Sequence, residues 1–275
     1  MYVLTDATAG SNVWTNVGGG FGDYGKAFGG LGGGTVSGYT AGGYPSAIDT
    51  IDKFSFTSDA DATDVGNLTD GRWGPVGNQS STFGYASGGN VVADRIDKYA
   101  YAADADATDV GNLTLGRYYS SGQSSSTHGY VSGGTTTSTN IIDKFTFASD
   151  ADATLVGQLS NTAVWGLSGQ SSVTYGYASG GEHSGTVYTT TIDKFSFTSD
   201  ANATDIGSLT VARNYTSGHS SNTHGYTSAG TTASRQDVID KFSFASEGTS
   251  TDVGNTTVAR ISTSGTSSTT HGYTS

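Results

Sequence analysis

The stretch that decides the fold is "GRYYSSGQSSSTHGYVSGG", residues 116–134, which is polar, glycine-rich and almost free of charge. Close copies recur as "GRWGPVGNQSSTFGYASGG" at residues 71–89 and as "ARNYTSGHSSNTHGYTSAG" at residues 212–230. Such a segment holds too few apolar residues for an ordinary core strand. Its recurrence indicates a fold that needs the same polar strand pair many times.

The spacing of the copies indicates a repeat protein. A Gly-Tyr pair recurs at steps of 45 to 49 residues, and a period of this length is typical of solenoids and propellers. The triplet "IDK" and a Gly preceded by an apolar residue recur with the same period. The tyrosines of the Gly-Tyr pairs are Tyr39, Tyr85, Tyr130, Tyr177, Tyr226 and Tyr273.

Each unit predicts four short strands and no helix. "IDKFSF" alternates as a strand does, "SDADA" is typical of a turn, and "TDVGNLT", "RYYSSGQ" and "HGYVSGG" predict the other strands. Six such units predict an all-β, six-bladed β-propeller with four antiparallel strands per blade. The Gly/Ser/Thr strand is then innermost, where crowding favours small side chains, and it lines a narrow polar channel. The single domain of residues 1–275 divides into units at about 19–66, 67–111, 112–157, 158–207, 208–254, and 255–275 plus 1–18.

The two ends of the sequence predict how the ring closes. The last unit stops at "HGYTS", after its two inner strands, and the opening residues "YVLTDATAGSNVWTNVG" resemble an "IDKFSF…TDVG" pair. The N-terminus is therefore expected to supply the two outer strands of the last blade, which leaves no exposed edge. Stopping just short of a Gly-Gly also fits a chain trimmed from something longer. The glycine-rich residues 18–34 are interpreted as either a flexible segment or a closely packed inner strand.

The pattern Arg72–Tyr85–Gly88–Gly89, with the Tyr thirteen residues after the Arg, resembles the kelch repeat, and it recurs along essentially the whole chain. This resemblance implies a kelch-like propeller, although the outer-strand tryptophan of kelch repeats is replaced by residues such as Val65. The phrase "IDKFSFTSDA" also resembles repeat proteins of tailed phages, particularly marine ones. That resemblance implies a virion or tail-fibre component whose partners are other virion proteins or a host-surface glycan or protein.

Composition excludes several classes of function. The net charge of −12 disfavours nucleic acid and anionic membrane surfaces as partners, and the absence of cysteine excludes disulfides and cysteine-based metal sites. No apolar run reaches the length of a membrane span, and the first residues lack the pattern of a signal peptide. We therefore expect synthesis in a cytoplasm without a cleaved signal, and location in a virion or otherwise in the cytoplasm. No cofactor is predicted.

Most basic residues occupy repeat positions. Five lysines belong to "IDK", and Lys26, Arg72, Arg117, Arg213 and Arg260 share one slot before the inner strand. We interpret them as structural ion pairs within or between blades, with the Asp of "IDK" as a candidate partner. Only Arg95 and Arg235 break the repeat, and both are expected in the loop between the second and third strands from the inside.

The acidic turns raise the question of calcium. An EF-hand loop needs a Gly at its sixth position and a Glu at its twelfth, and neither is present here. Asp also suits a hairpin turn without any ion. No metal site is therefore predicted, and the weak calcium candidates are Asp59, Asp61, Asp64, Asp104, Asp106 and Asp109.

Catalytic chemistry is difficult to assemble from this sequence. Glutamate occurs only at Glu182 and Glu247, and nearly every Asp is a repeated turn or strand residue. A glycosidase needs a pair of carboxylates, and no Ser lies in a nucleophile elbow. We therefore predict a protein that is not an enzyme.

The features that break the repeat gather on one rim of the predicted fold. Variable loops such as "EHSGTVYTTT" share this rim with the link that enters each inner strand. Aromatic rings there can stack on sugars or anchor a protein partner, although they can also simply cap the inner strands. The favoured function is a non-enzymatic phage module with a receptor- or glycan-binding rim; an intracellular kelch-type scaffold and a carbohydrate-active enzyme are the alternatives. The candidate rim residues are Trp73, Tyr118, Tyr119, Trp165, Tyr215, Tyr44, Arg95, Tyr188 and Arg235.

Overall fold

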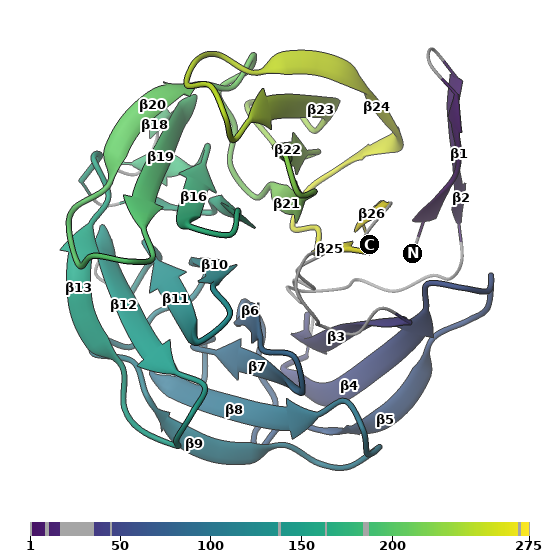
Figure 1. Cartoon of the computed structure of the whole chain (residues 1–275). Helices are drawn as coiled ribbons and strands as arrows, with labels where there is room; N and C mark the ends of the chain where they lie inside the picture. The colour runs from purple at the N-terminus through teal and green to yellow at the C-terminus, as the bar shows by residue number, and fades with distance from the viewer. Residues whose placement is uncertain are drawn as a thin grey trace.

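The computed structural model contains strands and no helix among its described residues (Figure 1). These are residues 36–44, 46–136, 139–162, 164–183, 187–268 and 271–274, together with the backbone of 2–8 and 11–16. The glycine-rich residues 18–34 and Lys26 lie outside them. Within the described part of the chain, no helix is long and apolar enough to cross a membrane.

The strands form small antiparallel sheets. Six of these sheets, numbered here in chain order, share one plan, in which successive strands lie side by side; each has four strands except sheet 1, which has three among the described residues. Sheet 1 contains β3 (Ser37–Gly43), β4 (Ile48–Ser55) and β5 (Thr63–Asn67). Sheet 2 contains β6 (Val76–Gln79), β7 (Phe83–Ser87), β8 (Arg95–Ala100) and β9 (Thr108–Asn112). Sheet 3 contains β10 (Ser121–Ser124), β11 (His128–Ser132), β12 (Ile141–Thr146) and β13 (Thr154–Gln158).

Sheets 4 and 5 follow the same plan, whereas sheet 6 takes strands from both ends of the chain and a seventh, short sheet is additional. Sheet 4 contains β15 (Ser168–Ser171), β16 (Tyr175–Ser179), β19 (Thr191–Ser196) and β20 (Thr204–Ser208). Sheet 5 contains β21 (Ser217–Ser220), β22 (His224–Ser228), β23 (Gln236–Ser243) and β24 (Thr251–Arg260). Sheet 6 joins β25 (Gly265–Ser267) and β26 (Gly272–Thr274) to β1 (Tyr2–Thr8) and β2 (Ser11–Asn16). A short extra sheet contains β14 (Val164–Trp165), β17 (Glu182–His183) and β18 (Val187–Tyr188).

Figure 1 shows the sheets side by side around the middle of the molecule, with β6, β10, β21 and β25, the first strands of sheets 2, 3, 5 and 6, toward the middle. The N-terminal strands pair as the sequence predicts, because Tyr2 lies opposite Thr274 and Val3 opposite Tyr273 between β1 and β26. The first and last strands of the chain therefore belong to one sheet.

The inner strands are held together by polar side chains. The amide of Gln123 donates to the carbonyl of Tyr177 at 2.9 Å, and the backbone N–H of Ser124 donates to Ser171 Oγ at 3.1 Å. The corresponding residues Asn78 and Gln170 make equivalent bonds to the next sheet. All these side chains are buried, so they fill the space between neighbouring inner strands.

Glycine is required between the inner strands for a steric reason. A Cβ on Gly122 would lie 2.3 Å from the carbonyl oxygen of Gly77 in the preceding sheet. A Cβ on Gly218 would lie equally close to the carbonyl oxygen of Gly169. Backbones approach too closely here for any side chain, which explains the repeated "SGxS" sequence.

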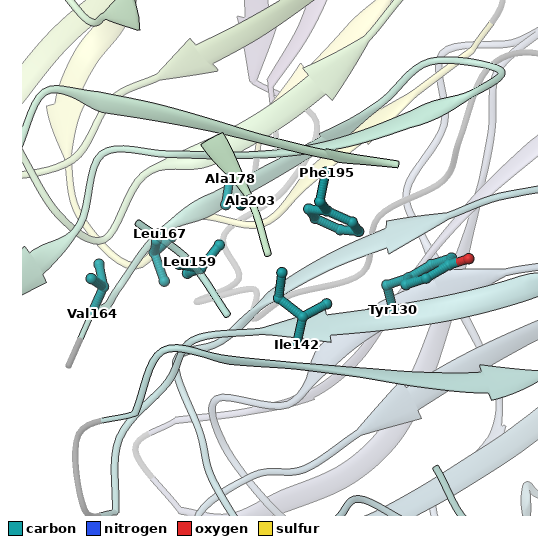
Figure 2. Packing of buried hydrophobic residues seen from close by; sticks show 8 residues of the cluster. All are labelled: Tyr130, Ile142, Leu159, Val164, Leu167, Ala178, Phe195 and Ala203. Carbon is teal, nitrogen blue, oxygen red and sulfur yellow. The ribbon is translucent and has the colours of Figure 1, made fainter. Parts of the chain in front are cut away.

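Aromatic rings join neighbouring sheets further out. Tyr130 of sheet 3 stacks on Phe197, which follows β19 of sheet 4, with ring centroids 4.7 Å apart. Tyr273 of sheet 6 stacks on Phe56, which follows β4 of sheet 1, at 4.9 Å. Figure 2 shows the apolar cluster between sheets 3 and 4, where Tyr130 also lies beside Phe195. The same stacked pair recurs as Tyr39–Tyr101, Tyr85–Phe147 and Tyr177–Phe244.

Ion pairs form as the repeat positions predict. Within a unit, the Arg before the inner strand pairs with the Asp of "IDK", and both side chains are fully buried. Between units, the Lys of "IDK" pairs with an acidic residue in the next unit's turn, near the surface. The buried pairs are Arg72–Asp97, Arg117–Asp143 and Arg213–Asp240; the surface pairs are Lys53–Asp104, Lys98–Asp150, Lys144–Asp200 and Lys194–Glu247.

Sheet 4 lacks the buried pair. Val164 occupies the slot of the Arg, and Asp193 is left 3% exposed with its Oδ1 atom unpaired. The other oxygen, Oδ2, accepts a hydrogen bond from the backbone of Ser160 at 3.2 Å. Burial raises the pKa of Asp193, because ionisation places a charge in a poorly solvated site.

Candidate binding site

Six candidate rim aromatics form one continuous group of rings, here called the aromatic cluster. The ring of Trp73 lies 5.3 Å from that of Tyr119, and Tyr119 lies 4.9 Å from Tyr215. Trp165 lies 5.3 Å from Tyr215 and 6.1 Å from Tyr119. Tyr118 contacts Trp73 and Tyr119, while Tyr44 contacts Trp73 at the end of the cluster.

The buried arginines set the place of these rings in the chain. Each cluster residue except Tyr44 comes one or two positions after the Arg slot, where the chain enters the inner strand. Because Arg117 is fully buried and ion-paired, the segment that follows it has a fixed starting point. Backbone bonds then link the sheets at this level: Tyr119 N donates to Gly74 O at 3.2 Å, and Gly166 N donates to Tyr119 O at 2.8 Å.

The cluster is only partly buried. The two tryptophans and the tyrosines at 118, 119 and 215 all keep part of their surface exposed, and Tyr44 is 60% exposed. Most ring pairs are tilted or edge-to-face, which is the arrangement that aromatic quadrupoles favour. The rings therefore stabilise one another and still present apolar surface to a ligand.

A buried carboxylate adjoins one end of the cluster. Glu182, in β17, lies opposite both Trp165 and Tyr188 in the short extra sheet. Its Oε2 atom accepts a hydrogen bond of 2.7 Å from the side-chain amide of Asn214. Burial raises the pKa of Glu182; burial also raises the pKa of Tyr215 to about 12, with the nearby Glu182 charge contributing.

Sequence reasoning did not select Glu182 or Asn214 as site residues. Two signals were available. Glu182 comes directly after a Gly-Gly pair and is one of only two glutamates, and Asn214 occupies a slot that holds Trp or Tyr in three other units.

The other candidate rim residues have different surroundings. Tyr188 lies beside the cluster, in β18 opposite Glu182. The expectation that Arg95 lies in a variable loop is wrong, because it is the first residue of β8 and pairs with Asp70 and Asp109. Arg235 is exposed, and its backbone forms an isolated bridge with Thr231.

Four of the six weak calcium candidates, Asp64, Asp104, Asp106 and Asp109, make contacts of their own. Asp104 pairs with Lys53, and Asp106 accepts hydrogen bonds from the backbone and side chain of Asn67 in the preceding sheet. Asp64 accepts a bond from the backbone of Gly66. Among the described residues, no three His, Asp or Glu side chains gather in a way that would hold a metal ion.

The arrangement suits recognition of an uncharged ligand. Aromatic faces offer stacking surface, and the carboxyl group of Glu182 adjoins one end of them, where its charge would repel an anion. No protein-family model and no curated protein matches this sequence. The candidate site therefore rests on its own geometry.

Proposed function

We propose that this protein is a non-enzymatic binding module, a six-bladed kelch-like β-propeller that binds a glycan at the aromatic cluster. The observation that carries the proposal is the continuous contact among Trp73, Tyr119, Trp165 and Tyr215, whose rings come from four successive repeat units. Partly exposed aromatic rings bind the apolar faces of sugars, and anchor residues in interfaces are enriched in the same side chains.

The propeller architecture is supported by contacts that recur from each sheet to the next. Stacked rings join sheets 1 to 2, 2 to 3, 3 to 4 and 4 to 5, and Ser220 N donates to Ser267 Oγ between sheets 5 and 6. The Tyr273–Phe56 stack joins sheet 6 to sheet 1. Pairing of β1 with β26 would close such a ring with strands from both ends of the chain.

Binding is favoured over catalysis by what the carboxylates do. Asp97, Asp143 and Asp240 are paired with buried arginines, and the turn acids pair with lysines of the preceding unit. Glu182 is buried, and its Oε2 atom accepts a hydrogen bond from the amide of Asn214. Hydrolysis of a glycosidic bond ordinarily needs a pair of carboxylates.

The phage assignment is supported by the sequence resemblance alone. The "IDKFSFTSDA…TDVGNLT" phrases implied a virion or tail-fibre component, and a glycan-binding surface suits a protein that contacts a host envelope. The proposed location is thus the virion, and the proposed partners are neighbouring virion proteins and a host-surface glycan.

A glycan array tests the binding function. The wild type should bind a subset of glycans, and Trp73→Ala and Trp165→Ala should each lose most of that signal. Tyr175→Ala is the matched control, because Tyr175 is a partly exposed aromatic residue that lies under Lys194, outside the cluster. Equal signal from the wild type and both tryptophan variants, or no signal from any of them, would remove the proposal.

A further inference from the structure

The second residue after the Arg slot has a left-handed backbone in every unit where it is described. Its φ is 70° at Gly74, 55° at Tyr119, 69° at Gly166, 52° at Tyr215 and 54° at Ser262. Glycine adopts this conformation at little cost, whereas a bulky side chain rarely does. Tyr119 and Tyr215 therefore hold large rings where the local backbone favours glycine.

Glycine and tyrosine alternate along the rim in a way that packing explains. Gly74 and Gly166 each follow a tryptophan, and each lies against the next unit. A Cβ on Gly74 would lie 3.4 Å from the ring of Tyr119, and one on Gly166 would lie 3.1 Å from the backbone N of Tyr215. Packing against the next unit thus adds to the positive φ in favouring glycine, more strongly at Gly166 than at Gly74.

The cluster accordingly contains the same pair twice. Trp73 with Tyr119 forms the first half-site, and Trp165 with Tyr215 forms the second, each with ring centroids 5.3 Å apart. The second half-site lies two repeat units after the first and directly contacts it, because the ring of Tyr119 lies 4.9 Å from that of Tyr215 and 6.1 Å from that of Trp165. Such duplication matches a ligand that also repeats.

We propose that the two half-sites bind successive parts of one uncharged polysaccharide chain, and that Tyr119 and Tyr215 are binding residues kept there despite their strained backbones. This inference rests on the proposed glycan-binding function. The uncharged class is favoured because the protein carries a net charge of −12 and Glu182 adjoins the second half-site, so an acidic polymer would be repelled. Backbone strain of this kind persists at sites where it serves a function.

The strain can be measured without any ligand. Tyr119→Ala and Tyr119→Gly both remove the ring, but only glycine relieves the left-handed backbone. The glycine variant should therefore melt about 2–4 °C above the alanine variant, and the same order should hold at Tyr215. Trp73 has no positive φ, so at this control position the alanine variant should be the more stable one. Equal melting temperatures for Tyr119→Gly and Tyr119→Ala would overturn the claim of strain.

The duplication is tested with defined oligomers of glucose and of N-acetylglucosamine, both β-1,4-linked and one to eight sugars long, measured by calorimetry. Affinity of the wild type should rise with length and then level off once both half-sites are spanned. Tyr119→Gly and Tyr215→Gly should each weaken binding of the longest oligomer about tenfold or more, and each should remove the dependence on length.

The outcomes separate the two proposals. If the wild type binds single sugars as tightly as long oligomers, or if only one of the two tyrosine variants loses affinity, the paired half-sites are wrong while glycan binding stands. If the wild type prefers an acidic polymer such as polygalacturonate, the uncharged class is wrong. If it binds none of these oligomers and no glycan on the array, the proposed function itself fails.

Discussion

The guanidinium of Arg117 lies 2.9 Å from the carboxylate of Asp143, and neither side chain is exposed at all. Burial lowers the pKa of Arg117, while the Asp143 charge opposes that shift. The same arginine also donates to the backbone carbonyls of Leu115 and Val131. Arg117 thus connects the segment just before Tyr118 and Tyr119 to β11 and β12, which makes this ion pair the first target for a stability experiment.

Removing one partner of this pair should destabilise the protein strongly. Asp143→Asn leaves a buried guanidinium without its counter-ion, which typically costs about 3–5 kcal/mol. Lys144→Ala is the control in the same strand, because its pair with Asp200 is near the surface and should contribute less than about 1 kcal/mol. Urea unfolding of both variants measures the difference. Similar losses for the two would contradict the structural role of the buried pair.

Asp193→Asn should stabilise the protein, in contrast to Asp143→Asn. Burial raises the pKa of Asp193, so the folded protein favours its protonated form and loses stability as the pH rises through that raised value. At pH 7 the ionised carboxylate is a cost, and the asparagine variant should therefore unfold at higher urea than the wild type. The advantage should shrink as the pH falls through the raised pKa of Asp193 and should vanish below about 4, the ordinary pKa that Asp has in an unfolded chain. A variant that is less stable at pH 7 would refute this reading.

Gly122→Ala should reveal the close approach of the inner strands. The new methyl group would meet the carbonyl oxygen of Gly77 at 2.3 Å, and such overpacking typically costs about 1–3 kcal/mol. Gly272→Ala provides the comparison, since its methyl would meet only the side chain of His219, at 3.2 Å. Thermal unfolding should show a larger decrease in melting temperature for Gly122→Ala than for Gly272→Ala. Equal losses would mean that the inner strands can separate at little cost.

Cysteines at positions 2 and 274 should form a disulfide bond. These residues lie directly opposite each other between β1 and β26, and the protein has no other cysteine. The double variant Tyr2→Cys/Thr274→Cys should therefore lose its free thiols under mild oxidation, and it should melt at a higher temperature when oxidised. A second double variant, Tyr2→Cys/Gly272→Cys, shifts the register by two residues and should oxidise poorly. Free thiols in the first pair would argue against the pairing of the chain ends.

Much of the fold could be predicted because the repeat exposes it. The alternation in "IDKFSF" marks β12 and its equivalents, and the recurring apolar-Gly pair proves to be a bulge: Gly111 lies opposite Ile96 while Asp109 lies opposite Asp97. The pairing of Arg117 with Asp143 followed from two residue types that recur together. Each of these patterns recurs in several units, so the copies support one another.

The features that sequence reasoning missed occur once or depend on backbone angles. The extra sheet around Glu182 is formed by a segment that only one unit contains, so no repeated pattern in the sequence predicted it. Arg95 was misplaced because β8, like β12 and β19, begins one residue before its "IDK" triplet. The left-handed backbone of Tyr119 was invisible as well, since only comparison with Gly74 and Gly166 at the same slot makes it meaningful.

The contacts that join sheets use residues that hardly vary, such as the serine that receives the N–H of Ser124, while the two positions after each arginine vary freely. If the aromatic cluster binds a ligand as proposed, stability and recognition depend on different positions of the same repeat. Recombination between the near-identical repeat units would exchange the residues at the two positions after each arginine and would keep the contacts between sheets. If the protein binds a host glycan as proposed, a change in that glycan could be matched by new residues at these two positions while the residues that join the sheets stay the same.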